Sequence, residues 1–129
     1  MHKKMSVRNA ALSALAMGTI LAIPLTAAAD GPCGYTGGDP KHGDVIYHGT
    51  CVACHGEDGR GAVPGTPDFT KKGGGVLSKP HATLFKHIKD GFQEPGKPLS
   101  MPPEGGNPDL TDQDIKDVHS YLHKAFGCG

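Results

Sequence analysis

Two cysteines and a histidine fall within five residues, at Cys51-Val52-Ala53-Cys54-His55. This is the Cys-x-x-Cys-His pattern of covalent haem attachment. Two thiols on one helical turn can form thioethers with the two vinyl groups of a haem, and the adjacent imidazole can then bind the iron. A thioredoxin-like dithiol would need a βαβ setting, and a zinc site would need a second ligand pair nearby, and the sequence offers neither. The motif therefore predicts one covalently bound haem c, held by Cys51 and Cys54, with His55 on the iron.

A second iron ligand can be sought among the methionines. Of the 4 in the chain, Met1, Met5 and Met17 lie in an N-terminal segment that reads as a signal peptide, which leaves Met101. This residue sits among prolines in a loop between two predicted helices. A thioether suits low-spin iron, and a Met/His pair raises the reduction potential. We therefore expect Met101 to be the second axial ligand.

Six further histidines compete with this methionine. His87 is the best of them for a bis-histidine site. His119 and His123 are four residues apart on the last predicted helix, a spacing that could also suggest an adventitious surface metal site. We expect all six to be solvated residues on helix surfaces; they are His42, His48, His81, His87, His119 and His123.

The N-terminal residues 1–29 read as a secretory signal peptide. A basic start is followed by an apolar run from Ala10 to Leu25 and by the small residues Ala27-Ala28-Ala29, which form a plausible cleavage site. The alternative is an uncleaved membrane anchor, because the run is of borderline length for a span. Cleavage would release a 30–129 domain to the periplasm, and that domain has no second apolar run long enough to cross a membrane.

Charge argues against nucleic acid as a partner. The chain has 13 basic and 13 acidic residues. Lys3, Lys4 and Arg8 lie in the predicted signal peptide and no acidic residue does, so the remainder carries a net charge of −3 with histidine neutral. A general nucleic-acid binder would show a basic excess instead.

The rest of the chain predicts an all-α domain with long loops. With 20 Gly, 11 Pro and no Trp, a packed core would be thin, and a buried haem would add apolar volume. We expect three helices, running from Asp39-Pro40 to about Cys51, from Ser78 to Gly91, and from Thr111 to Gly127. Asp39, Ser78 and Thr111 are their predicted caps, the last in a capping box with Asp114. Residues 56–75 and 93–109 are predicted loops, and no strand pair is expected.

From about Gly43 to Gly127 the chain resembles a class I c-type cytochrome, and the Met101–Gly106 stretch resembles the methionine loop of the cytochrome c5-like group. The resemblance implies a small cytochrome c fold, about three helices wrapped round one haem. It also implies that Gly43 and Tyr47 cross the last helix at Tyr121. A proline carbonyl after the motif should accept a hydrogen bond from His55, and Pro67 fits best, with Pro64 as second choice.

The chain departs from the c5-like pattern in its cysteines. That group has an extra cysteine pair near the methionine loop, where this chain has Asn107-Pro108-Asp109. The spare cysteines are Cys33 and Cys128. We suggest that they pair within one chain, as an oxidising compartment permits; a link between two chains is the alternative.

These features predict a one-electron carrier, not an enzyme, that moves electrons between redox partner proteins such as a dehydrogenase, reductase or oxidase. One alternative is a haem subunit of a larger dehydrogenase or oxidase complex. Another is a haem sensor or peroxidase with an open iron, which would require that Met101 does not bind. Six lysines between Lys71 and Lys97, against Asp90 and Glu94, could steer docking to an acidic partner or could simply be solvated.

Overall fold

The computed structural model describes Tyr35 and residues 37–127. The predicted signal peptide and the predicted pair Cys33 and Cys128 lie outside these residues. Within them, one unbroken helical stretch carries the haem motif: α1 (Pro40–Ile46), a π-helical turn (Tyr47–Cys51) and α2 (Val52–His55). Asp39 caps its start by accepting a hydrogen bond from the Lys41 N–H, and Pro40 stands at the first position, as predicted. The helix runs to His55 instead of about Cys51, so the whole motif is helical.

Helix α3 (His81–Asp90) starts later than predicted. Ser78 does not cap it, because Ser78 ends a short 3-10 turn (Val76–Ser78) and its hydroxyl donates to the Gly75 carbonyl. Lys79 precedes Pro80 and is extended (ψ 155°), as residues before proline usually are. The helix can therefore begin only after Pro80. Its end at Gly91, with φ 78°, is as predicted.

A short strand pair contradicts the expectation that the chain has none. Strands β1 (Phe92–Gln93) and β2 (Ser100–Met101) are antiparallel, with Phe92 opposite Met101 and Gln93 opposite Ser100. Two residues are too few to show the alternating pattern of a strand. A 3-10 segment (Pro103–Gly106) follows β2.

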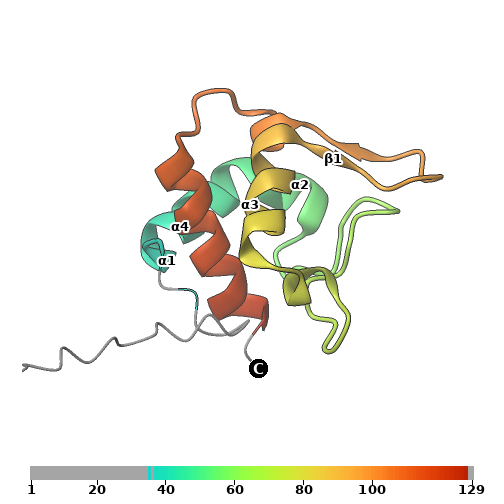
Figure 1. The fold of residues 1–129 in the computed structure, drawn as a ribbon, viewed down its shortest axis with the longest axis horizontal. Helices are drawn as coiled ribbons and strands as arrows, with labels where there is room; N and C mark the ends of the chain where they lie inside the picture. Colours follow the sequence, from blue (N-terminus) through green and yellow to red (C-terminus); the bar gives the residue numbers. More distant parts are fainter. Residues whose placement is uncertain (1–34, 36, 128–129) are drawn as a thin grey trace, which may run out of the picture.

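Helix α4 (Asp112–Leu122), continued by a π-helical turn (His123–Gly127), crosses α1 and α3 (Figure 1). The capping box of Thr111 and Asp114 is present, which confirms that prediction. A Cβ atom on Gly43 would lie 2.0 Å from the Asp117 carbonyl oxygen, so α1 and α4 touch through bare backbone. The Tyr47 and Tyr121 rings lie with centroids 5.2 Å apart, as the resemblance implies.

The core lies where these helices meet, and loop residues complete it. Residues 56–75 contain no helix or strand, as predicted, and Phe69 from this loop is buried. No helix among the described residues is long and apolar enough to cross a membrane. The buried hydrophobic residues are Ile46, Tyr47, Phe69, Leu77, Leu84, Ile115, Val118 and Leu122.

Candidate haem site

The two thiols of the motif are free and lie on the last turns of the first helical stretch. Cys51 is partly buried and Cys54 is exposed. Burial, with a smaller effect from Cys54, raises the pKa of Cys51 to about 11. A reactive redox dithiol needs the opposite shift, toward a thiolate at neutral pH. The environment of Cys51 therefore argues against thiol redox chemistry.

His55 has the properties of a haem-iron ligand. Its imidazole is buried, 8% exposed, and stacks on Phe69 with ring centroids 4.6 Å apart and planes 13° apart. Burial lowers the pKa of His55 to about 4, so at neutral pH the ring is uncharged and keeps a lone pair for a metal. Its Nδ1 atom is buried without a hydrogen-bond partner among the described residues.

That orphaned Nδ1 bears on the predicted bond to Pro67. An iron-bound histidine carries its proton on the other ring nitrogen, which usually donates to a carbonyl or carboxylate. Pro67 is exposed and follows the motif in the loop, but its carbonyl does not accept from His55 in this structure. A buried nitrogen without a partner costs free energy. A carbonyl that accepted a hydrogen bond from Nδ1 of His55 would therefore stabilise the ring.

The loop after the motif folds back onto the helix end. The Gly61 N–H donates to the His55 carbonyl at 2.8 Å, and the Ala62 N–H donates to the Cys54 carbonyl at 2.9 Å. Gly56, with φ 81°, turns the chain out of the helix, and the Tyr47 hydroxyl donates to the Gly56 carbonyl at 2.6 Å. These bonds satisfy carbonyls that a helix end leaves without partners, and they hold the motif rigidly against the loop.

Met101 is partly buried on β2, and its loop contacts both flanks of the motif. After Met101, the Asn107 side-chain amide donates to the Thr50 hydroxyl at 3.4 Å. Before it, Leu99 lies 3.6 Å from where a Cβ on Gly65 would be. The loop that carries Met101 therefore reaches both the residue before Cys51 and the loop after His55.

Gly91 is what lets this loop approach the end of α3. A Cβ atom there would lie 2.7 Å from the Met101 carbonyl oxygen and 2.9 Å from the Pro103 nitrogen. Gly91 was predicted only as a helix terminator, and Asn107 was not predicted as a contact at all. No sequence signal marks Asn107, because its partner is distant in the chain.

Two of the six histidines contradict the expectation of surface positions. His119 is 0% and His123 is 2% exposed. Both lie on α4 or its continuation, which is covered on one side by α1 and on another by α3. Burial, aided by His123 and His81, lowers the pKa of His119 to about 3. His42 and His48 are exposed, as expected, whereas His81 and His87 are only partly exposed.

The lysines are partly paired. Lys86 forms an ion pair with Asp90, and Lys89 forms one with Asp112. Asp90 is already counted in the basic excess between Lys71 and Lys97, so only Asp112 reduces that excess further. Exposed pairs of this kind add little stability.

Known proteins match the same region of the chain. The model of the family described as "Cytochrome c" matches residues 40–126. The chain belongs to the cytochrome c family. Haem c, covalently attached, is the cofactor of this cytochrome, and its family carries electrons. One relative is cytochrome c-554(548) of Halomonas halodenitrificans, which is 37% identical over 57% of this chain and 81% of its own length. Another is cytochrome c-555 of Prosthecochloris aestuarii, which is 33% identical over 65% of this chain and 85% of its own length.

A third relative is much larger than this cytochrome. It is the cbb3-type cytochrome c oxidase subunit CcoP of Rhodobacter capsulatus, 34% identical over 66% of this chain but only 29% of CcoP. None of the three relatives is named as a cytochrome c5, so the resemblance to that group stays a prediction.

Proposed function

We propose that this cytochrome is a periplasmic one-electron carrier in which Cys51 and Cys54 hold the haem and His55 and Met101 bind its iron. The observation that best supports this proposal is that the Met101 loop contacts the chain on both sides of the motif, at Thr50 and at Gly65. A loop fixed in this way would keep Met101 close to the motif, so that His55 and Met101 could both hold the iron of a bound haem.

The chain's own residues then do three things. The neutral, buried His55 offers one nitrogen to the iron and its other nitrogen to a carbonyl, for which Pro67 remains our candidate. The thioether of Met101 would favour the reduced form of the iron and so raise the reduction potential. Phe69, stacked on His55, excludes water from the ligand. The haem supplies the one-electron redox change.

The N-terminal sequence supports export of this cytochrome. The predicted signal peptide would deliver the chain to the periplasm, where c-type haem is attached. We infer that its partners are redox proteins, to which it delivers or from which it takes electrons. The match to CcoP, a named oxidase subunit, favours one second candidate, a haem-carrying part of a larger oxidase or dehydrogenase complex.

Absorption spectra of the haem-loaded protein test this ligation. We expect the ferric protein to show the weak red absorption band of methionine ligation, and we expect the ferrous protein not to bind carbon monoxide. Met101→Ala should lose the band, bind carbon monoxide and lower the potential on the order of 0.1 V, a modest part of the roughly 0.8 V range that axial ligands control. Ser100→Ala, an exposed neighbour on the same strand, is the matched control and should change nothing.

Two results would decide against this proposal. If Met101→Ala keeps the band and excludes carbon monoxide, Met101 is not the ligand. If the unmodified protein already binds carbon monoxide readily, the iron is open, and a sensor or peroxidase function becomes the better explanation. Purification from the native source distinguishes a carrier from a subunit. A free carrier would purify by itself, whereas a subunit would copurify with the rest of its complex.

A further inference from the structure

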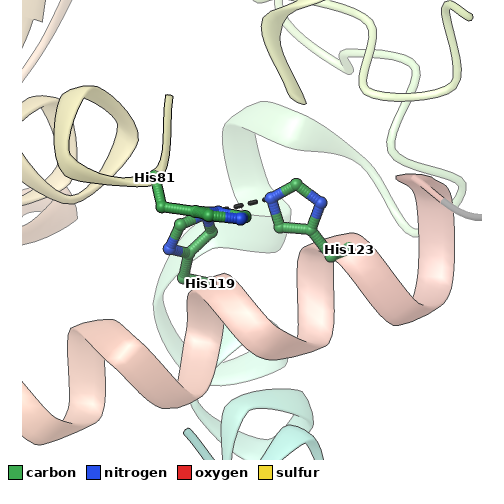
Figure 2. A group of neighbouring side chains, drawn as sticks. All are labelled: His81, His119 and His123. Carbon is green, nitrogen blue, oxygen red and sulfur yellow. Dashed lines mark hydrogen bonds between the residues drawn. The ribbon is translucent and has the colours of Figure 1, made fainter. Parts of the chain in front are cut away.

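Three histidines that take no part in the proposed haem ligation meet between α3 and α4. Figure 2 shows His119 and His123 rising from one face of α4 and its continuation, with His81 reaching over them from the start of α3. Residues four apart on a helix project from the same side, which places His119 and His123 next to each other. Their ring centroids are 4.8 Å apart, and the centroid of His81 is 5.0 Å from each.

The nitrogens, and not only the rings, converge. The Nε2 atom of His119 lies 3.2 Å from Nδ1 of His81 and 3.0 Å from Nε2 of His123. Each residue offers one nitrogen, and these three all lie within 4.8 Å of one another. A tetrahedral Zn²⁺ bound at about 2.0–2.1 Å holds its nitrogen ligands about 3.3 Å apart. Two of the three separations are already close to that value, and the third is no longer than 4.8 Å.

Hydrogen bonding alone does not account for this arrangement. An imidazole nitrogen has a single site in the ring plane, which either donates one proton or accepts one. His119 Nε2 faces two ring nitrogens at hydrogen-bond distance, so it can satisfy only one of them well. Its other nitrogen, Nδ1, is buried with no hydrogen-bond partner among the described residues. A metal ion, in contrast, can accept one lone pair from each of three imidazole nitrogens that face it.

The surroundings suit a late transition metal. The ligand set is made of imidazoles, which favour Zn²⁺, Cu²⁺ or Ni²⁺ over the oxygen-seeking Ca²⁺ and Mg²⁺. His119 is fully buried, but His81 is only partly buried, which gives an ion a way in. The Tyr35 ring stacks on His119 at 4.3 Å and lies 4.7 Å from His81, and it covers one side of the cluster.

A second group of possible ligands, His42, Asp114 and Asp117, is a weaker candidate. Its members already have good hydrogen-bond partners: Asp117 accepts from His42 at 2.8 Å and from the Asp39 N–H at 2.8 Å. His42 is exposed, and this group therefore serves below as the control.

We propose that His81, His119 and His123 form a three-histidine site for one divalent transition-metal ion, of which Zn²⁺ fits best, with the fourth position open to water. The ion would join the start of α3 to the end of α4. Its occupancy would thus stabilise the packing of α3, the helix whose end at Gly91 supports the Met101 loop. This inference does not depend on which residues bind the haem iron.

The test is a calorimetric titration of Zn²⁺ into the haem-loaded protein, free of affinity tags and treated with a chelator. We expect one equivalent to bind. His81→Gln should weaken binding more than about tenfold, since loss of even an outer-shell partner of a ligand costs 10–100-fold. His42→Gln should bind Zn²⁺ as the unmodified protein does. X-ray absorption at the zinc edge should show histidine nitrogens as the main ligands.

His81→Gln is the primary variant because His81 is partly exposed and stands at a helix start, where the fold tolerates change. Thermal unfolding supplies a second readout: Zn²⁺ should raise the midpoint of the unmodified protein and of His42→Gln, but not that of His81→Gln. The proposal is overturned if no stoichiometric binding occurs, if His81→Gln binds as tightly as the unmodified protein, or if His42→Gln abolishes binding.

Discussion

Replacing Gly43 by alanine should separate α1 from α4. The new Cβ atom would lie 2.0 Å from the Asp117 carbonyl oxygen and 2.8 Å from the Val118 nitrogen, where ordinary contact begins at 3.4 Å. The shortfall to the oxygen is 1.4 Å, and both neighbours are backbone atoms of a helix, which cannot rotate away. The helices must therefore move apart.

The expected cost follows from two opposing effects. Overpacking of this kind typically costs about 1–3 kcal/mol, and here the upper end applies because the same crossing holds the buried Tyr47 and the hydrogen bonds to Asp117. Alanine in place of glycine favours a helix by about 1 kcal/mol. The net loss is about 2 kcal/mol of unfolding free energy, which corresponds to roughly 8–16 °C in the unfolding midpoint of a domain of this size.

Gly49→Ala is the matched control. Gly49 lies in the same helical stretch and is exposed, and a Cβ atom added to it would meet no atom within 4 Å outside its chain neighbours and its own helix backbone. Alanine there should leave the midpoint unchanged or raise it slightly. The assay is thermal and guanidinium unfolding of both haem-loaded variants in one redox state, followed by far-ultraviolet circular dichroism. If Gly43→Ala unfolds at the same midpoint as the unmodified protein, or if both variants lose equal stability, the close approach is not what Gly43 provides.

Two further predictions concern the methionine loop and pH. Gly91→Ala should weaken the methionine band in the ferric spectrum, because its Cβ would displace the Met101 carbonyl, whereas Gly96→Ala, with a similar φ of 80° but no atom within 4 Å, should lose stability without changing the spectrum. The hydrogen bond to Asp117 raises the pKa of His42, so its stabilising effect is complete below the unfolded pKa of about 6.5 and is lost as pH rises through the higher folded value. The stability difference between the unmodified protein and His42→Gln should therefore shrink as the pH rises above about 6.5, and a difference that stays constant with pH would show that His42 is not charged in the fold.

The parts of this fold that were predictable from sequence are mostly local. Asp39 with Pro40 and the capping box of Thr111 and Asp114 act within one helical turn, so their patterns carry the whole interaction. Ser78 also looked like a cap, but Pro80 two residues later forced the intervening residue into an extended conformation and moved the helix start. At this position the restriction that Pro80 places on the residue before it outweighed the capping preference of Ser78.

The missed features depend on contacts between distant segments. His119 and His123 occupy helix positions whose exposure is decided by α3, and a pattern within α4 alone cannot show that cover. The β1–β2 pair depends on a turn that brings two dipeptides together, and the bond from Asn107 to Thr50 spans 57 residues. The crossing of Gly43, Tyr47 and Tyr121 was foreseen only through resemblance to a family.

Helix α4 links the two halves of the proposed haem site without contributing a ligand to it. Through Gly43 it fixes α1, which continues into α2 and so sets the position of Cys51, Cys54 and His55. Its other side packs against α3, whose end at Gly91 supports the loop of Met101. The distance between the two proposed axial ligands is therefore controlled by how α1 and α3 sit on α4. A metal ion held by the three-histidine cluster would act on one of these two contacts only, so we expect it to affect the methionine side of the iron before the histidine side.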